Sequence, residues 1–533
     1  MTLYTSSLNK TKESTGFRRG VAGFSLATGI SRLTGLAREV VMASLFGAGF
    51  AKDAFEIAFR IPNLLRDFFA ENALAASFVP VFVEKMQGED RRDLWRLSNN
   101  LFNTLLIVVG ALAVLGVIFS PQLVSVIGHG FKGIPGKIEL TTLLNRILFP
   151  FLLFISLSAW SAGVLNAHNR FFLPAVSSAF FNLGSIAVAY LTYNFWISKG
   201  LDPIVGMAIG GLVGVFFQFL VPYIAVWRRG YRYRPYVNWR SPDLGRVLKL
   251  WIPVVIGLGL VEIQVAVDTF LAALLEQGSV SWLSYAYRVM HLPLALFGAA
   301  VGTVSLTLFS RQRAEGNLEG LASSLQRSLR TISVLLIPIL LFVIAFAHPV
   351  IRVIYQRGEF APLDTDYTAQ ALMLYVAGIW AASSVRTLSV AFYAFKDSRT
   401  PMFVNLGSVV LNISLNLLLA FVILQTRRFR AFAFATTFCS FFSMGILMTL
   451  LKRKLPVWKA GDHPLYGLRV LAAAVIALLP IYLGYRFYFI DRIEGFLPVL
   501  LMLGVGFVLF ALIYFGLARL FGIKELGGIL RRR

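Results

Sequence analysis

Long apolar runs separated by short polar connectors dominate this chain from about residue 21 onwards. A helix needs about 20 mostly apolar residues to cross the hydrocarbon core of a bilayer, and about fourteen runs reach that length. The runs are too long and unbroken for barrel strands, and lipid-facing backbone must satisfy its own hydrogen bonds, so α-helices are predicted. The expected spans are 21–46, 53–83, 98–127, 140–166, 172–196, 204–227, 246–276, 283–311, 329–350, 368–394, 401–424, 431–451, 466–488 and 494–521.

The composition agrees with an all-α polytopic membrane protein. Hydrophobic residues make up 57% of the chain and charged residues only 14%. The net charge of +24 resides in short connectors rather than in a basic soluble domain, so we do not expect a nucleic-acid partner. The single cysteine, Cys439, excludes a disulfide within one chain, and the five histidines lack a paired ligand spacing.

The basic connectors predict the orientation. They follow the even-numbered spans, and Lys and Arg mark the cytoplasmic side, so both termini are expected in the cytoplasm. An exception is "QTRRFRA" at 425–431, where either a span is miscounted or the arginines serve the outer leaflet; we favour the second. The expected cytoplasmic segments are a tail at 1–20 and a basic linker at 229–245.

An internal repeat predicts two lobes. Two pairs of segments resemble each other at nearly one offset, 228 and 227 residues, which spans six helices and therefore indicates parallel repeats. The expected organisation is an N-lobe at 21–228, a C-lobe at 246–455, a central cavity between them, and two further helices within 456–533. The matching segments are 55–82 with 283–309, placing Arg60 opposite Arg288, and 165–185 with 392–412, placing Pro174 opposite Pro401.

Charged residues interrupt several of these spans. Each charge at a bilayer centre costs at least about 2.5–3.5 kcal/mol, so a span rarely keeps several without a use for them. In the first span Arg32 and Glu39 share a helical stripe, and Arg38 lies about 120° round from Arg32. In the second span Pro62 is expected to interrupt the helix. The candidate substrate-binding residues are Arg32, Arg38, Glu39, Asp53, Arg60, Arg66 and Arg288.

Two interpretations of these charges remain open. They form ion pairs that hold helices together, or they line a wet cavity whose arginines bind an anion. We favour the cavity because apolar replacement of a buried ion pair is often neutral or stabilising, so pairing alone rarely explains so many charges. The planar guanidinium binds phosphate through two hydrogen bonds and stays charged. For Arg66, extension of the side chain to the membrane interface is an alternative.

A second polar set lies in the spans of the C-lobe. We favour interhelical hydrogen bonding by these side chains, although it explains a carboxylate least well. A site for a cation or a proton, which the oxygen ligands also suit, is the alternative. The candidate cation-site residues are Asp268, Asn412, Asn416 and Thr436. The chain has no phosphate-binding loop of the G-x-x-x-x-G-K-[ST] type and no segment with a catalytic carboxylate pair, so we expect neither an enzyme nor a cofactor.

The segment "SRLTGLAREVVMASLFGAGFAKDAFEIAFRIPNLLRDFFAENALAASFVPVF", with "GSVSWLSYAYRVMHLP" and "FYAFKDSRTP", resembles the MurJ (MviN) lipid II flippase family of the multidrug/oligosaccharidyl-lipid/polysaccharide exporter superfamily. The resemblance implies fourteen helices in a bacterial cytoplasmic membrane. It also implies movement of undecaprenyl-pyrophosphate-linked peptidoglycan precursor to the outer leaflet by alternating access. Its implied partners are lipid II, membrane lipids and other cell-wall synthesis proteins.

The resemblance also implies roles for individual residues. The cavity arginines of the family fall on Arg32, Arg38, Arg66 and Arg288, and its acidic residue at the start of the second span falls on Asp53. Members of the family often carry a carboxylate where this chain has His291 and an aspartate where it has Glu39, and the last two helices form a groove for the lipid tail.

Two other transporter classes remain as alternatives. A flippase for another polyprenyl-linked glycan, of the O-antigen type, shares the same physical logic. A drug or cation exporter of the same superfamily would favour acidic residues in its cavity. The driving force expected for any of them is a monovalent cation or the membrane potential, which supplies about 2.3 kcal/mol per charge per 100 mV.

Overall fold

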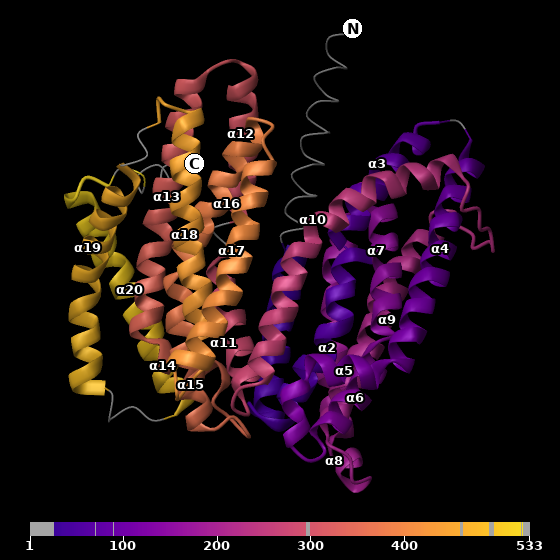
Figure 1. Ribbon diagram of the computed structural model, residues 1–533, viewed down its shortest axis with the longest axis horizontal. Coiled ribbons are helices and arrows are strands. Elements are labelled where there is room, and N and C mark those ends of the chain that lie inside the picture. Colours follow the sequence, from indigo (N-terminus) through magenta and orange to yellow (C-terminus); the bar gives the residue numbers. More distant parts are fainter. Residues whose placement is uncertain are drawn as a thin grey trace. The chain divides into compact units, whose positions relative to one another are not determined.

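The computed structural model describes residues 26–69, 71–88, 90–294, 299–458, 462–489, 495–523 and 525, and within these ranges the regular structure is entirely helical. The all-α prediction is therefore confirmed. The expected tail at 1–20 lies outside the described residues. The helices form two compact units, the first ending at Gln277 and the second beginning at Gly278 (Figure 1).

The first unit contains a helix at 26–46 and nine further α-helices. These are α2 (Phe50–Phe69), α3 (Glu71–Met86), α4 (Arg91–Ile118), α5 (Ser120–Ile127), α6 (Lys137–Leu148), α7 (Phe151–Ala167), α8 (Phe172–Ser198), α9 (Ile204–Trp227) and α10 (Pro242–Ala273), with the short 3-10 helix η1 (His129–Gly133) before α6.

The second unit contains ten α-helices. These are α11 (Ser279–Pro293), α12 (Ala299–Ala314), α13 (Leu318–Ala345), α14 (Ala347–Tyr355), α15 (Pro362–Ala377), α16 (Ile379–Ala394), α17 (Arg399–Leu417), α18 (Arg430–Lys454), α19 (Asp462–Gly484) and α20 (Phe496–Leu520). The π-helical segments η3 (Leu418–Ile423) and η4 (Tyr485–Phe489) extend α17 and α19.

Ten helical stretches among the described residues are long and apolar enough to cross a membrane. The remaining expected spans are also helical where the structure describes them: 26–46, α2 with α3, α10, and α11 with α12. The first two contain most of the charged candidate residues. A polytopic helical membrane protein is thus confirmed, and the full count of fourteen spans stays a prediction.

The predicted repeat is visible in the helix boundaries. The helices α4, α5 and α8 begin at Arg91, Ser120 and Phe172, and α13, α14 and α17 each begin 227 residues later. Two left-handed turn positions recur at the same offset, Asn169 with Lys396 and Gly200 with Arg427.

One helix is grouped differently from the predicted lobes. The repeat assigns 246–276 to the C-lobe, whereas α10 packs against α2, α3, α4 and α5 of the first unit. At one contact between these helices, Trp251 Nε1 donates a hydrogen bond of 2.8 Å to the carbonyl of Phe68. The lobe boundaries themselves stay a prediction.

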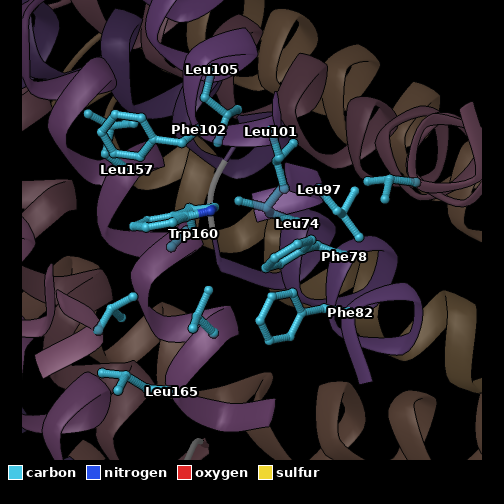
Figure 2. Packing of buried hydrophobic residues seen from close by; sticks show 14 of the residues in the cluster. Leu74, Phe78, Phe82, Leu97, Leu101, Phe102, Leu105, Leu157, Trp160 and Leu165 are labelled. Atoms are coloured by element: carbon cyan, nitrogen blue, oxygen red, sulfur yellow. The ribbon is translucent and has the colours of Figure 1, made fainter. Parts of the chain in front are cut away.

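Aromatic and aliphatic side chains of α3, α4 and α7 form a large part of one core cluster in the first unit. Figure 2 shows Trp160 beside Phe102, with Phe78 and Phe82 lying along α3 below them. The rings of Phe102 and Trp160 pack edge to face with centroids 4.9 Å apart. Phe59 and Leu65 of α2, the helix that carries several of the charged candidate residues, pack against this core.

The proline of the second span does not interrupt the helix, contrary to expectation, because α2 runs through Pro62. Proline has no N–H, so the carbonyl of Ala58 lacks its usual helical donor. The fully buried side chain of Asn145 on α6 supplies a replacement at 2.7 Å, and its own oxygen accepts from Ser120 at 2.8 Å.

The basic linker is an extended strap laid along α4. Three buried asparagines of that helix, Asn99, Asn100 and Asn103, hydrogen-bond to the backbone of 232–238. Both the carbonyl and the amide of Asn238 bond to Asn100, at 2.8 and 2.7 Å. The asparagine side chains thus provide the backbone of this extended stretch with hydrogen-bond partners that a neighbouring β-strand would otherwise supply. Sequence periodicity alone could not reveal this arrangement.

Candidate functional site

The helix at 26–46 presents its charged residues in two different environments. Arg32 is exposed, whereas Arg38 and Glu39 are buried at 9% and 3% exposure. The stripe predicted from spacing therefore does not give Arg32 and Glu39 the same surroundings. Asn182 on α8 secures the helix by donating to the Ser31 carbonyl at 3.3 Å and the Thr34 hydroxyl at 3.2 Å.

Four buried charges join this helix to α2. Arg38 donates to Glu39 Oε1 through an NH2 contact of 2.7 Å and an Nε contact of 3.3 Å. The other oxygen of Glu39 lies 3.4 Å from Lys52 Nζ, which also contacts Glu56 at 2.6 Å. The guanidinium of Arg38 lies over the ring of Phe181, 4.8 Å from its centroid. Two positive and two negative side chains thus meet in the interior.

A second buried ion pair joins α2 to α6. Asp53 on α2 contacts Nζ of Lys137 on α6 at 3.0 Å, and both side chains are almost fully buried. The ammonium of Lys137 also lies 4.0 Å from the centroid of Phe131, an arrangement that attracts a cation to the ring face. Asp53 therefore has a lysine beside it.

Sequence reasoning missed both lysines. The separation of Lys52 and Glu56 by four residues on one helix was a usable signal, because such side chains are neighbours on a helix surface. Lys137 is 84 residues from Asp53, and no local pattern links them. These pairs agree with the ion-pair interpretation for Glu39 and Asp53, while Arg32 stays exposed.

The other candidate arginines, Arg60, Arg66 and Arg288, are less buried than Arg38. Arg66 pairs with the adjacent Asp67 at 2.9 Å, with both side chains about one-third exposed. Arg60 is half-buried, and its Nε has no hydrogen-bond partner among the described residues. Arg288 belongs to α11 of the second unit, where its Nε lies 3.4 Å from the Ser284 hydroxyl.

The second polar set is divided between the units. Asp268 is half-buried on α10 of the first unit, while the other three residues lie on α17 and α18 of the second. Asn412 and Asn416 are fully buried and bond to each other at 3.1 Å. Thr436 donates to the carbonyl of Phe432 at 2.8 Å. These local hydrogen bonds fit the packing interpretation of the amides and hydroxyl.

Among the described residues, no group of three or more His, Cys, Asp or Glu side chains is arranged to hold a metal ion. The buried charges of the first unit instead combine arginine and lysine with carboxylates, a combination suited to exchanging one anionic partner for another.

Comparisons with known proteins identify relatives along most of the chain. The family model described as lipid II flippase MurJ matches residues 42–502. The probable lipid II flippase MurJ of Vibrio cholerae is 34% identical over 431 residues, covering 79% of this chain and 80% of the relative. The lipid II flippase MurJ of Burkholderia cenocepacia is 30% identical over 525 residues, covering 95% and 96%.

Solved structures give the same relationship. A lipid II flippase MurJ in an inward closed conformation is similar with a TM-score of 0.76 and 26% identity, covering 93% of this chain and 98% of the other. An inward-facing multidrug resistance MATE transporter of the MOP superfamily has a TM-score of 0.66 at 14% identity, covering 80% and 95%, a likeness of fold alone.

Proposed function

The chain belongs to the MurJ lipid II flippase family, and from that premise we propose that it carries lipid II across the bacterial cytoplasmic membrane, from the inner to the outer leaflet. It is a transporter and not an enzyme. Its work supplies peptidoglycan synthesis, and both termini lie in the cytoplasm in the orientation that the basic connectors favour.

The physical task is to move a pyrophosphate, two sugars and a peptide through about 30 Å of hydrocarbon. Charged groups in a polar cavity lower the desolvation cost while the polyprenyl tail stays in lipid. Arg32, Arg38 and Arg288 bind the pyrophosphate, and two lobes rock to expose the cavity to either side. Ligand binding drives this change only through different affinities for the two states.

The observation that carries this proposal is the state of Arg38. Its guanidinium is buried and contacts a carboxylate oxygen at 2.7 Å, the geometry of a charge-assisted hydrogen bond. Phosphate oxygens are acceptors of the same kind, so a pyrophosphate can take the place of Glu39. Arg32, exposed and six residues earlier, offers a second cation on the same helix.

Asp53 and Arg66 have supporting roles in this proposal. Asp53, paired with Lys137, anchors the start of α2 beside α6. Arg66 is partly exposed and pairs with Asp67, so it can contact the head group without unpairing a fully buried carboxylate. The membrane potential or a monovalent cation drives the cycle, and Asp268 with Asn412, Asn416 and Thr436 stays a candidate site for that cation.

Two other substrates are weighed against lipid II. An exporter of cationic drugs or of cations would favour acidic residues in its cavity, because arginines repel a positively charged substrate. A flippase for another polyprenyl-linked glycan would use the same pyrophosphate chemistry, and family membership favours lipid II over it.

Complementation of a strain depleted of its own lipid II flippase tests the proposal. Arg38→Ala and Arg288→Ala should each abolish growth and the appearance of precursor in the outer leaflet, with protein levels matched. Lysine at these positions should rescue poorly because an ammonium cannot form two parallel hydrogen bonds to phosphate. Arg240→Ala, in the exposed connector, is the matched control and should rescue fully. Full rescue by both alanine variants would refute the arginine clamp.

A further inference from the structure

Glu39 contacts two cations, Arg38 and Lys52, at different distances. Its Oε1 contacts the Arg38 NH2 at 2.7 Å, and its Oε2 lies 3.4 Å from Nζ of Lys52. Lys52 is already in close contact with Glu56 at 2.6 Å. Both carboxylates and the lysine are buried, with Lys52 at 0% exposure.

We propose that Lys52 is a positioning residue for substrate binding, because its charge allows Glu39 to release Arg38 to the pyrophosphate of an incoming lipid. This inference rests on the proposed function. Lys52 has no exposed surface through which to touch the substrate, so it acts through Glu39.

The reasoning follows from the cost of an unpaired buried charge. When Arg38 turns to a phosphate, Glu39 loses the cation that lies 2.7 Å from it. A buried carboxylate whose charge is less well compensated is strongly unfavourable. Lys52 already lies within ion-pair distance of the other oxygen of Glu39, Oε2, and a movement of less than 1 Å would bring it to a normal charge-assisted contact there. A lysine suits this exchange because its ammonium is a compact charge on a flexible stem and can be shared between two carboxylates.

Removal of Lys52 should therefore tighten the hold of Glu39 on Arg38. The full-length protein in phosphatidylcholine nanodiscs would be titrated with undecaprenyl pyrophosphate. We expect Lys52→Met to weaken binding about tenfold and Lys52→Arg to stay within about threefold of the wild type. Adding Glu39→Gln to Lys52→Met should restore most of the affinity, because an amide holds Arg38 far less strongly than a carboxylate does.

Two matched double variants separate this role from a structural one. If Lys52 merely stabilises the fold by pairing with its nearer partner, Glu56→Gln should repair Lys52→Met and Glu39→Gln should not. The proposal requires the reverse: Glu39→Gln should restore binding to Lys52→Met, and Glu56→Gln should not. Lys137→Met, which also removes a fully buried lysine but one paired with Asp53, should show no rescue by Glu39→Gln.

A measurement without any lipid tests the same exchange. Phenylglyoxal modification, followed at the Arg38 peptide by mass spectrometry, should slow several-fold in Lys52→Met and accelerate in Glu39→Gln alone, a variant that keeps both lysines. If wild-type protein fails to bind the pyrophosphate but these rates shift as stated, the proposed substrate is wrong and the role of Lys52 stands. Unchanged rates, or rescue by Glu56→Gln only, would overturn the role of Lys52.

Discussion

The hydrogen bond from Asn145 to the carbonyl of Ala58 supports the helix that carries Asp53 and Arg66. Pro62 cannot donate to that carbonyl, and Asn145 fills the position at 2.7 Å. Replacing Asn145 with Leu keeps a similar volume but leaves the carbonyl of Ala58 without its donor, whereas the Ser120 hydroxyl keeps the Gly116 carbonyl as its acceptor at 2.8 Å. A buried acceptor without a partner costs about 1–3 kcal/mol, so we expect the free energy of unfolding to fall by about that amount.

The free energy of unfolding would be measured by titrating detergent-solubilised protein with sodium dodecyl sulfate and following tryptophan fluorescence. Thr141→Val is the control, because that buried hydroxyl bonds within its own helix and its loss should cost less than about 1 kcal/mol. Pro62→Ala supplies the missing N–H, so Asn145→Leu should cost about 1–2 kcal/mol less in that background. Strictly additive effects would refute the idea that Asn145 compensates for the proline.

Two further predictions concern helix packing and pH. A Cβ atom at Gly214 on α9 would lie 2.6 Å from the carbonyl oxygen of Phe180 on α8, so Gly214→Val should lower the free energy of unfolding by about 2 kcal/mol or more. Gly245→Val is the control, because a Cβ atom there would meet open space. Equal losses in the two variants would contradict the packing argument. In the connector after α16, the Lys454 ammonium and then the hydroxyl of Thr400 hold the pKa of the Asp397 carboxyl below its usual range. The stabilisation from Asp397 is present above its unfolded pKa of about 3.9 and is lost as the pH falls through the lower folded pKa. Lys454→Met should therefore lower the free energy of unfolding by about 0.5–1 kcal/mol at pH 7. In thermal unfolding, the difference in stability between this variant and the wild type should narrow below about pH 4. A difference in stability that does not depend on pH would show that charge is not the cause.

The candidate site was predictable in part. Charges inside apolar runs are conspicuous, so Arg38, Glu39 and Asp53 could be selected without a structure. Their partners could not all be selected in the same way. Lys52 lies near the first residues of a predicted span, where a lysine is ordinarily taken to face the membrane surface. Its complete burial results from the close approach of α2 to the helix at 26–46.

The fold shows a similar division. The repeat was readable because the two pairs of similar segments share nearly one offset, and the boundaries of three helix pairs recur 227 residues apart. The continuity of α2 through Pro62 was not readable, because the compensating donor comes from Asn145 on another helix. The course of the strap also depends on side chains of α4, more than a hundred residues away from it in sequence.

By itself the sequence determined the helical membrane class, the parallel repeat and the family, because hydrophobic length, charge placement and motif are properties of local segments. Tertiary structure alone decided which cation each buried carboxylate meets. Glu39 lies between Arg38 and Lys52, and Asp53 lies beside Lys137. The physical reason is that a buried charge must find its partner within a few ångströms in space, whatever the distance along the chain.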